Sequence, residues 1–316
     1  MTPPDSTQAE PAESVPAGRA QPPLARSGPD RAAEERATPD LLERARADAA
    51  TRVLVLNGDL APLAAADALH WVGPEAAPDG AQWAFLGRRD DGIALLTAAS
   101  PRAEPEPFPA PAGWAPLRAV GGGLAPIHAG AFVEALSLGR WLIEAPFCSA
   151  CGTRTEVRNA GWSRHCPSCG REHFPRTDPA VIVAITSRAH PDRLLLGSNA
   201  MWADNRFSCF AGFVEAGESL EAAVAREVRE EAGVEVIDVA YRGSQAWPYP
   251  RSLMLGFLAA AADDTAAEAD GEEILAVRWF ERSEIGAGLE GRSDLLLPGP
   301  ASIAHSLISD WYASTG

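Results

Sequence analysis

The chain has 316 residues, of which 46% are hydrophobic, so about two domains of ordinary size can each bury a core. Its 43 acidic and 27 basic residues leave a net charge of −16, and a surface of that charge repels a phosphate backbone, which excludes a generic nucleic-acid binder. No apolar run reaches the ~18 residues of a membrane span, and the N-terminus lacks a basic start followed by an apolar stretch, so we expect neither a membrane segment nor a secretory leader.

The first part of the chain is poor in large apolar side chains. Up to residue 48 it has no aromatic residue, and its only large aliphatic residues are Val15, Leu24, Leu41 and Leu42. Such a segment cannot offset the entropy of ordering by burial. We therefore predict a disordered tail over residues 1–50, in which residues 41–50 can form a short helix.

Short apolar runs bounded by turn residues begin after this tail and predict strands. A loop over residues 103–113 interrupts them. We expect a small β-rich domain over residues 51–125 and then a linking helix within residues 126–146, because apolar side chains recur with helical periodicity over residues 129–145. The predicted strands cover residues 53–56, 83–86 and 93–96.

Four of the five cysteines form two close pairs, Cys148-x2-Cys151 and Cys166-x2-Cys169, with 14 residues between the pairs. This spacing suits a tetrahedral zinc ion, and because sulfur fills every ligand position the zinc should be structural. The alternatives are two disulfides or four buried thiols. We therefore predict a zinc ribbon over residues 147–175 and a reducing compartment, the cytoplasm.

From residue 178 onward, predicted strands and helices alternate, which indicates a mixed α/β sandwich over residues 176–316. Its helices are expected over residues 219–232 and 302–311. Cys209 lies in the predicted strand 209–213 and is expected to be a small core residue. The other predicted strands cover residues 180–186, 194–197, 236–240, 253–258 and 276–280.

The strongest signal is the carboxylate-rich helix of this domain. Ser219 can cap its first turn and Gly233 can end it. With about 100° between successive residues, Glu227 and Glu231 lie at the edge of the apolar stripe, and Glu230 lies one step further round. A solvated face with i,i+4 ion pairs explains exposed charges but not Glu231, which points between core positions. A hard divalent cation compensates such a carboxylate, so the pattern predicts a metal site.

Residues 212–234 resemble the Nudix box, which implies hydrolysis of a diphosphate, and the helix suits this chemistry. A diphosphate bridge is anionic and repels an attacking water, whereas two or three Mg²⁺ or Mn²⁺ ions neutralise it and lower the pKa of a bound water. Glutamate supplies the oxygen ligands that Mg²⁺ prefers, and Arg226 can orient those carboxylates. Gly212 permits the preceding loop to approach the helix closely.

A second array follows at residues 244–252, with the sequence Ser-Gln-Ala-Trp-Pro-Tyr-Pro-Arg-Ser. Its prolines stiffen a loop, and the rings of Trp247 and Tyr249 can stack on a base. Gln245 and Ser252 supply hydrogen bonds. The alternative is a proline-rich turn with buried aromatic side chains.

These motifs together carry a family resemblance. Residues 212–234 match the Nudix box, G-x5-E-x7-R-E-U-x-E-E-x-G-U with U aliphatic, at every fixed position. With the four-cysteine ribbon before it and the second array after it, the chain resembles the NADH pyrophosphatase (NudC-type) family, whose array reads S-Q-P-W-P-F-P-x-S. Ala246 and Tyr249 depart from that pattern. The resemblance implies a Nudix α/β/α sandwich over residues 176–316. It covers residues 114–316 well and residues 51–113 only in layout.

The resemblance also implies roles for individual residues. Glu227, Glu231 and Glu273 become ligands of Mg²⁺ or Mn²⁺ together with the backbone carbonyl of Ala211, and Glu230 becomes a ligand or the base that activates water. Glu273 is chosen by its separation from Trp279 along the sequence, and Glu272 stays the alternative. A family glutamate that contacts the substrate falls on Gly161. The implied substrate contacts are Gln245, Ala246, Trp247, Pro248, Tyr249, Pro250, Arg251 and Ser252, with Phe174, Ala304 and Arg118.

The function implied by the resemblance is hydrolysis of the pyrophosphate of NADH or NAD⁺ to AMP and nicotinamide mononucleotide, and removal of NAD caps from RNA. A homodimer is implied as well, with aromatic residues of one subunit completing the pocket of the other. Two alternatives stay open: a Nudix hydrolase for another nucleoside diphosphate derivative, and a non-catalytic module that binds a nucleotide or RNA. The presence of every glutamate of the box favours the enzyme.

Overall fold

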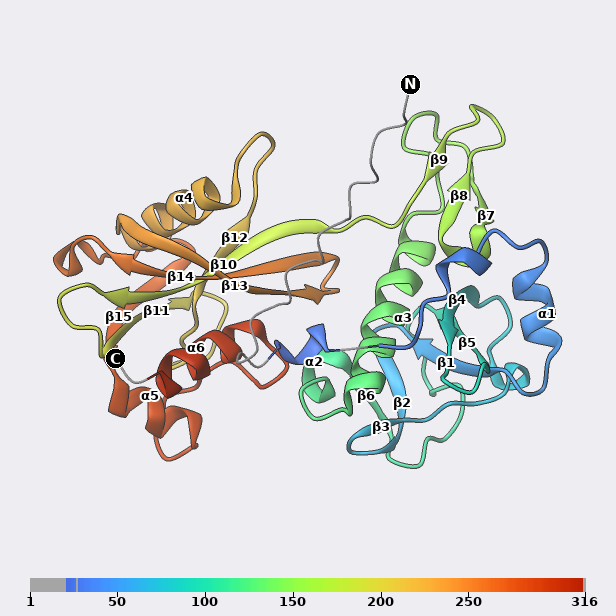
Figure 1. The fold of residues 1–316 in the computed structure, drawn as a ribbon, viewed down its shortest axis with the longest axis horizontal. Coiled ribbons are helices and arrows are strands. Elements are labelled where there is room, and N and C mark those ends of the chain that lie inside the picture. The colour runs from blue at the N-terminus through green and yellow to red at the C-terminus, as the bar shows by residue number, and fades with distance from the viewer. Residues whose placement is uncertain (1–20, 27, 315–316) are drawn as a thin grey trace, which may run out of the picture.

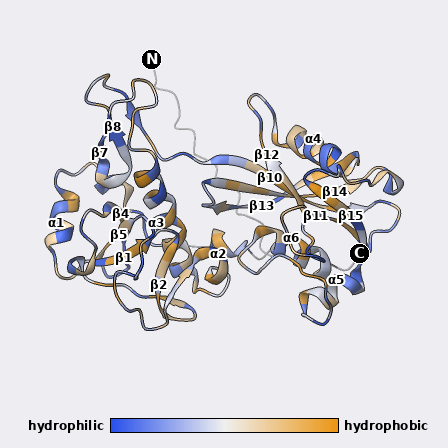
Figure 2. Cartoon of the chain, turned by 180° about the vertical axis from the view of Figure 1, so that it is seen from behind, coloured by the Kyte–Doolittle hydropathy of each residue, from blue (hydrophilic) through white to orange (hydrophobic). Residues whose placement is uncertain are grey.

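The computed structural model describes residues 21–26 and 28–314 (Figure 1). These residues form a β-rich N-terminal domain, a small cysteine-bearing ribbon and a C-terminal domain of strands and helices. None of the described helices is long and apolar enough to cross a membrane. Apolar residues concentrate on the strands of both sheets and on the long helix that follows the first sheet (Figure 2).

The N-terminal domain is a mixed sheet covered on both faces. Its elements are α1 (Leu41–Ala47), β1 (Arg52–Asn57), β2 (Leu60–Ala65), β3 (Ala68–Leu69), β4 (Gln82–Arg88), β5 (Ala94–Ser100), β6 (Trp114–Pro116), α2 (Leu117–Val120) and α3 (Pro126–Glu144). The strand order is β3-β2-β1-β5-β4, and β6 pairs with β2. Side chains of β1 alternate between the faces, so Leu54 and Leu56 pack with α3 while Val53 and Val55 pack with α1.

The described part of the N-terminal segment packs on this domain. Leu24 is buried with the α3 cluster, whereas Ala32, Leu41 and Ala45 are buried with the α1 cluster. The prediction of a disordered tail is therefore wrong for the described residues from 21 to 50, whereas the short helix expected within residues 41–50 is present as α1. Residues 1–20 and 27 lie outside the description. The segment is ordered because its few apolar side chains are placed where each one reaches the core.

The ribbon consists of β7 (Glu156–Arg158), β8 (Ser163–His165) and β9 (Glu172–His173), which pair antiparallel. It is attached to the N-terminal domain rather than to the C-terminal one. Trp162 Nε1 donates a hydrogen bond to Phe85 O at 2.8 Å, and a Cβ added at Gly161 would lie 2.5 Å from Ala84 Cβ. The ribbon therefore continues the N-terminal domain beside α3 (Figure 1).

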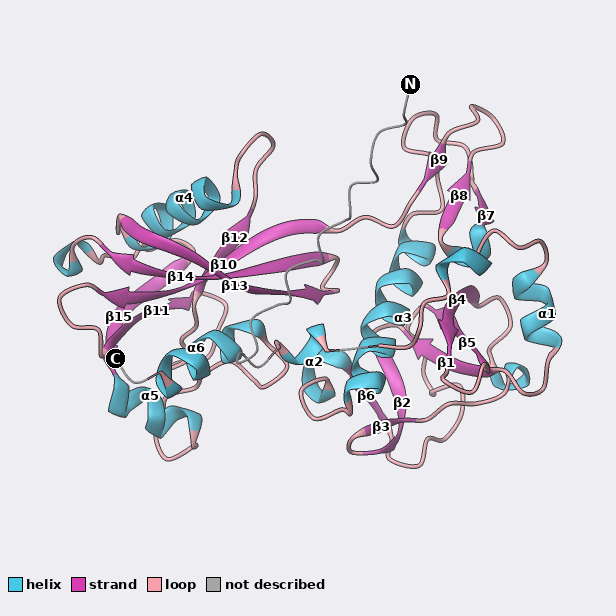
Figure 3. Ribbon diagram, in the orientation of Figure 1, coloured by secondary structure: helices cyan, strands magenta, loops and turns pink. Residues whose placement is uncertain are grey.

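The C-terminal domain is a sheet between two layers of helices. Its elements are β10 (Asp178–Ser187), β11 (Arg193–Asn199), β12 (Phe210–Phe213), α4 (Leu220–Ala232), β13 (Val236–Trp247), β14 (Ser252–Ala261), β15 (Ile274–Glu281), α5 (Arg282–Leu289) and α6 (Ile303–Ala313). The strand order is β13-β14-β10-β11-β15, β12 pairs with β10, and β10 runs parallel to β14. α4 covers one face, and α5 and α6 cover the other (Figure 3). The predicted α/β/α sandwich is confirmed.

Most predicted elements of this domain appear with shifted ends, but two differ. α5 is absent from the prediction. The predicted strand 236–240 extends as β13 through Trp247, because residues 244–247 pair with residues 252–255 of β14. The first half of the second array is therefore strand rather than a proline-stiffened loop, and only residues 248–251 form the turn.

Candidate active site

Helix α4 forms as the sequence predicts. Ser219 Oγ accepts a hydrogen bond from the Ala222 N–H at 3.2 Å, and Gly233 adopts the left-handed conformation, with φ of 66°, that ends the helix. Val224 and Val228 are fully buried against the sheet. The caps and the apolar stripe fix the rotation of the helix, and this rotation sets the positions of its carboxylates.

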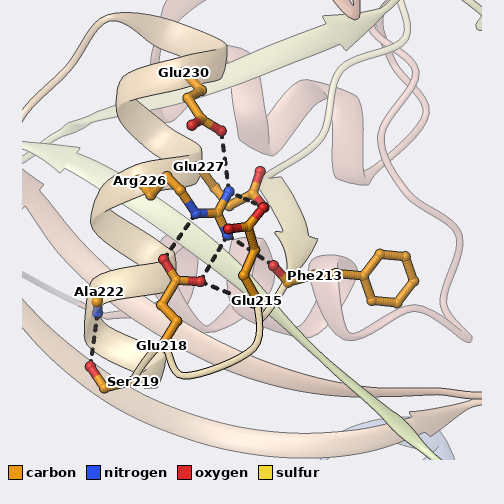
Figure 4. Close-up of polar contacts among 8 residues, drawn as sticks. All are labelled: Phe213, Glu215, Glu218, Ser219, Ala222, Arg226, Glu227 and Glu230. Carbon is orange, nitrogen blue, oxygen red and sulfur yellow. Dashed lines mark hydrogen bonds and ion pairs between the residues drawn. The ribbon is translucent and has the colours of Figure 1, made fainter.

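Arg226 lies at the centre of a network of carboxylates (Figure 4). Its Nε and Nη2 atoms each lie 2.9 Å from Glu218, and Nη1 lies 2.8 Å from Glu227 and 3.1 Å from Glu230. Nη2 also donates to the carbonyl oxygen of Phe213 at 2.9 Å. The pairing with Arg226 lowers the pKa of Glu218. Arg226 thus holds three carboxylates in fixed orientations, and the i,i+4 pair with Glu230 is one part of this network.

Glu231 is the buried member of the acid group. Its side chain is 6% exposed, and its Oε2 atom has no hydrogen-bond partner among the described residues. Burial, and then the charges of Glu227, Glu273 and Asp270, raise the pKa of Glu231 to about 8. Burial also raises the pKa of Glu227. An unpartnered buried carboxylate beside other carboxylates is costly unless a cation compensates it, and carboxylate oxygens suit Mg²⁺ or Mn²⁺, so this donor set fits such ions.

A cavity of about 280 Å³ adjoins this group. Five of the residues that line it are predicted site residues: Ala211, Glu231, Trp247, Glu273 and Ala304. Glu273, rather than Glu272, is among the lining residues. The lining of the cavity therefore combines carboxylates with aromatic and apolar side chains, which also include Met254 and Ile303.

Four polar or aromatic residues that line the cavity are absent from the predicted site: Asn199, Trp202, Ser208 and Ser302. Asn199 Nδ2 lies 3.4 Å from Glu273 Oε1, and Trp202 follows in the loop after β11. Phe213, which is 54% exposed, projects beside the Arg226 network (Figure 4). Asn199 and Trp202 belong to no periodic pattern, so no sequence signal marks them. Phe213 lies inside the Nudix box, and that position could have marked it as a candidate site residue.

The second array lies at the interface between the two domains. Tyr249 Oη accepts a hydrogen bond from the backbone N–H of Arg118 at 3.1 Å, and its ring lies 5.2 Å from that of Trp247. Both rings pack against the core of the N-terminal domain. Gln245 is 1% exposed, and its amide is bonded within the chain. The alternative interpretation, a turn with buried aromatic side chains, therefore describes part of this array. Of the two aromatic side chains in the array, Trp247 lines the cavity.

The remaining array residues divide by exposure. Pro248 and Ser252 are buried, Ala246 is half-buried, and Pro250 and Arg251 are exposed. The Nε atom of Arg251 donates to Asp178 Oδ2 at 2.8 Å.

Of the predicted substrate contacts, Trp247 and Ala304 line the cavity, whereas Phe174 lies elsewhere. Phe174 is 45% exposed and lines a separate cavity with Trp162 and Arg36, because it follows the ribbon, which is attached to the N-terminal domain. Within one chain, Phe174 therefore does not share the cavity that Trp247 lines. Gly161 has no room for a side chain against β4, so the glutamate contact of the family is absent here.

The cysteine cluster has the geometry of a zinc site. The Sγ atoms of Cys148, Cys151, Cys166 and Cys169 all lie within 4.8 Å of one another, and no disulfide joins them. The separations of 3.6 Å between Cys148 and Cys169 and 3.5 Å between Cys151 and Cys166 are close to the ~3.8 Å that a tetrahedron with Zn–S bonds of ~2.3 Å requires. These four thiols fit a structural zinc ion.

Cys209 is separate from this cluster. It is buried in the core on the α6 side of the sheet, and burial raises the pKa of its thiol to about 12. The prediction of a small core residue is confirmed, since such a thiol is protonated and unreactive at neutral pH.

Comparisons with known proteins match two parts of the chain to family models and most of the chain to named relatives. A family model described as a NUDIX domain matches residues 176–297, and one described as an NADH pyrophosphatase zinc ribbon domain matches residues 144–174. The chain is 40% identical over 314 residues to the NAD-capped RNA hydrolase NudC of Mycobacterium tuberculosis, which covers 93% of this chain and 96% of that protein. The protein of the same name from Stutzerimonas stutzeri is 40% identical over 179 residues, 57% of this chain and 60% of that one. A solved NUDIX hydrolase from Nitrosomonas europaea is 27% identical and covers 44% of this chain and 78% of its own, with a TM-score of 0.34.

Proposed function

This chain belongs to the NADH pyrophosphatase (NudC-type) family of Nudix hydrolases, and on that premise we propose that it hydrolyses the pyrophosphate bond of NADH and NAD⁺ to AMP and nicotinamide mononucleotide. In NAD-capped RNA the same bond joins nicotinamide mononucleotide to the 5′-phosphate of the RNA, so we propose that the chain also removes such caps. The observation that carries the proposal is the single cavity that both Glu231 and Trp247 line. One end suits the metal-bound diphosphate and the other suits a base or the nicotinamide ring.

The metal end is assigned to the acid group. Glu227, Glu231 and Glu273, with the carbonyl of Ala211, would hold two or three Mg²⁺ or Mn²⁺ ions. When bound, these ions neutralise the diphosphate and make a bound water more acidic. Glu230, whose side chain is 60% exposed, is placed to ligate a metal or to take a proton from that water.

Arg226 orients this acid group. Its hydrogen bonds to Glu227 and Glu230 hold both carboxylates before the substrate arrives. Such preorganisation lowers the cost of assembling the site during the reaction.

We also propose a cytoplasmic homodimer in which Phe174 serves the partner's pocket. Phe174 is exposed and lies away from the cavity of its own chain, which supports a role across a dimer interface. Mixing of two inactive variants tests this. A chain with Phe174→Ala and a chain with Glu231→Gln would form heterodimers in which one pocket has both native residues, so activity should rise well above that of either variant alone. No gain after exchange of subunits would reject the shared pocket.

Product analysis tests the reaction itself. The purified chain is incubated with NADH, NAD⁺, NAD-capped RNA, ADP-ribose and a dinucleoside polyphosphate, with Mg²⁺ or Mn²⁺, and the Glu231→Gln variant serves as the matched control. We expect AMP and nicotinamide mononucleotide from NADH, and RNA with a 5′-monophosphate from the capped RNA. A higher kcat/KM for ADP-ribose or the polyphosphate than for any NAD-containing substrate would overturn the proposed substrate class.

A further inference from the structure

A short N-terminal segment, residues 22–26, lies between the two domains and takes no part in the reaction proposed above. We call it the strap; it contains a turn of 3-10 helix, Pro23–Ala25. Leu24 is 4% exposed and belongs to the apolar cluster against which Trp247 and Tyr249 also pack. Arg26 Nη2 lies 3.2–3.5 Å from the carbonyl oxygens of Gly121, Gly122 and Leu124, which anchors the strap to the turn before α3.

The strap reaches the C-terminal domain through Gln245. The backbone N–H of Leu24 donates to Gln245 Oε1 at 3.2 Å, and Gln245 Nε2 donates to the carbonyl oxygen of Ala301 at 2.9 Å. The Gln245 side chain is buried, and a buried amide whose partners are lost leaves unpaired polar groups that cost free energy. One side chain therefore joins three segments: the strap, β13 and the turn before α6.

Two of these three segments lead directly into the cavity wall. Trp247 lies two residues after Gln245 on the same strand, and Ala304 lies three residues after Ala301. The interface between the two domains is closely packed here, since a Cβ added at Gly122 would lie 2.6 Å from the backbone of Pro300. Helix α4, with its carboxylates, is not connected to Gln245 by these hydrogen bonds.

We propose that Gln245 is a positioning residue rather than a substrate contact, and that the strap acts through it to hold the base-binding wall of the cavity. The substrate side of this inference rests on the proposed function. The donor and acceptor of the Gln245 amide are engaged within the chain, and its side chain is closed to solvent. A loss of the strap contact should therefore loosen the wall formed by Trp247 and Ala304 and leave the metal end unchanged.

Matched variants test the strap. Leu24→Ala replaces an isobutyl side chain of the strap by a methyl group. Leu41→Ala makes the same change on α1, where Leu41 is buried on the other face of the N-terminal sheet. Gln245→Met removes the amide that accepts the hydrogen bond from the strap, whereas Leu24→Ala keeps the backbone N–H but removes the buried side chain that holds the strap in place. We expect each variant to raise KM for NADH by roughly fivefold or more, the scale of a lost hydrogen bond. Neither should change the turnover of an alkyl diphosphate diester that has no base. Leu41→Ala should leave KM unchanged even if it lowers the melting temperature equally.

Two further measurements separate positioning from general destabilisation. In the Leu24→Ala, Gln245→Met double variant, KM should rise no further than in the stronger single variant, because both changes break the same connection. Amide hydrogen exchange should be faster in peptides covering residues 244–249 and 299–306 for Leu24→Ala but not for Leu41→Ala. Additive KM effects, or equal exchange in both leucine variants, would overturn the proposal. Wild-type protein that fails to hydrolyse NADH would refute the proposed function, while the exchange data would still decide the role of the strap.

Discussion

Gly212 lies so close to Glu227 that an added Cβ at position 212 would be 1.9 Å from the carboxyl carbon of Glu227. Gly212 is on β12, opposite Val181 of β10, and Glu227 is on α4, so the strand and the helix meet at this point. The φ of Gly212 is one that any residue can adopt, so position 212 requires glycine because a side chain there would collide with Glu227. This contact explains the first glycine of the Nudix box, which the sequence analysis attributed to close approach.

Gly212→Ala should move the Glu227 carboxylate while the fold persists, because a carboxylate at the end of a flexible side chain can be displaced more easily than backbone. We expect kcat to fall by roughly 10²-fold, the scale of a lost electrostatic group. Gly123→Ala is the control, since a Cβ there meets its neighbours only at ordinary distances. Kinetics and melting curves check both variants, and a kcat near the wild-type value for Gly212→Ala would show that Glu227 tolerates displacement.

Glu230→Gln and Glu231→Gln should each keep the fold and lower kcat by roughly 10²-fold or more, because each removes a charge from the acid group. Glu231→Gln should not destabilise the metal-free protein, since it replaces a buried carboxylate that has an unpartnered oxygen. Steady-state kinetics and denaturant titrations measure the two effects. Near-normal turnover in both variants would remove the metal role assigned to α4.

Cys166→Ser should lose the bound metal and lower the melting temperature by roughly 5 °C or more, because the ribbon has little core of its own. Cys209→Ala should keep one zinc per chain, since Cys209 lies in the core away from the cluster. Elemental analysis and calorimetry test this pair. Zinc-free wild-type protein with disulfides on thiol titration would reject the site.

Glu134 should make stability depend on pH. Its side chain is buried on α3, Oε1 has no partner among the described residues, and Oε2 lies 3.8 Å from Arg31 Nε. Burial raises the pKa of Glu134 to about 7, against the opposing charges of Arg31 and Arg36. The folded protein therefore binds a proton more tightly than the unfolded chain, and the stabilisation is complete below pH ~4.5 and lost as the pH rises to ~7.

Glu134→Gln should remove this dependence. The free energy of unfolding of the variant relative to wild type should increase by up to about 3 kcal/mol between pH 5 and pH 7.5. Glu144→Gln, an exposed position at the end of the same helix, is the control and should show no such change. Urea titrations at several pH values measure the difference, and parallel curves for wild type and Glu134→Gln would contradict the raised pKa.

Trp247→Ala should raise KM for NADH by about 5- to 150-fold, because stacking of a base on an aromatic ring contributes ~1–3 kcal/mol. Trp247 also packs against the N-terminal core, so some loss of melting temperature is expected. Turnover of a diphosphate diester without a base separates lost recognition from lost stability. Lost base recognition affects NADH alone, whereas lost stability affects both substrates. Equal losses on both substrates, together with a lower melting temperature, would reject the recognition role.

The metal sites follow from local sequence because their geometry is local. Residues four apart on a helix share one edge whatever the rest of the chain does, so Glu227 and Glu231 are paired by spacing alone. The two C-x2-C pairs likewise shape their own turns, and only the meeting of one pair with the other depends on the fold.

The base-binding side depends on packing between distant segments. Leu24 and Gln245 are 221 positions apart, and no periodicity links them. The separation of Phe174 from Trp247 follows from the attachment of the ribbon to β4, where Gly161 meets Ala84. Such contacts form only when the sheets and helices of two domains are assembled, because burial and loop paths then determine which side chains meet. A motif therefore identifies the carboxylates that would hold the metals, whereas the wall beside Trp247 is a property of the assembled domains.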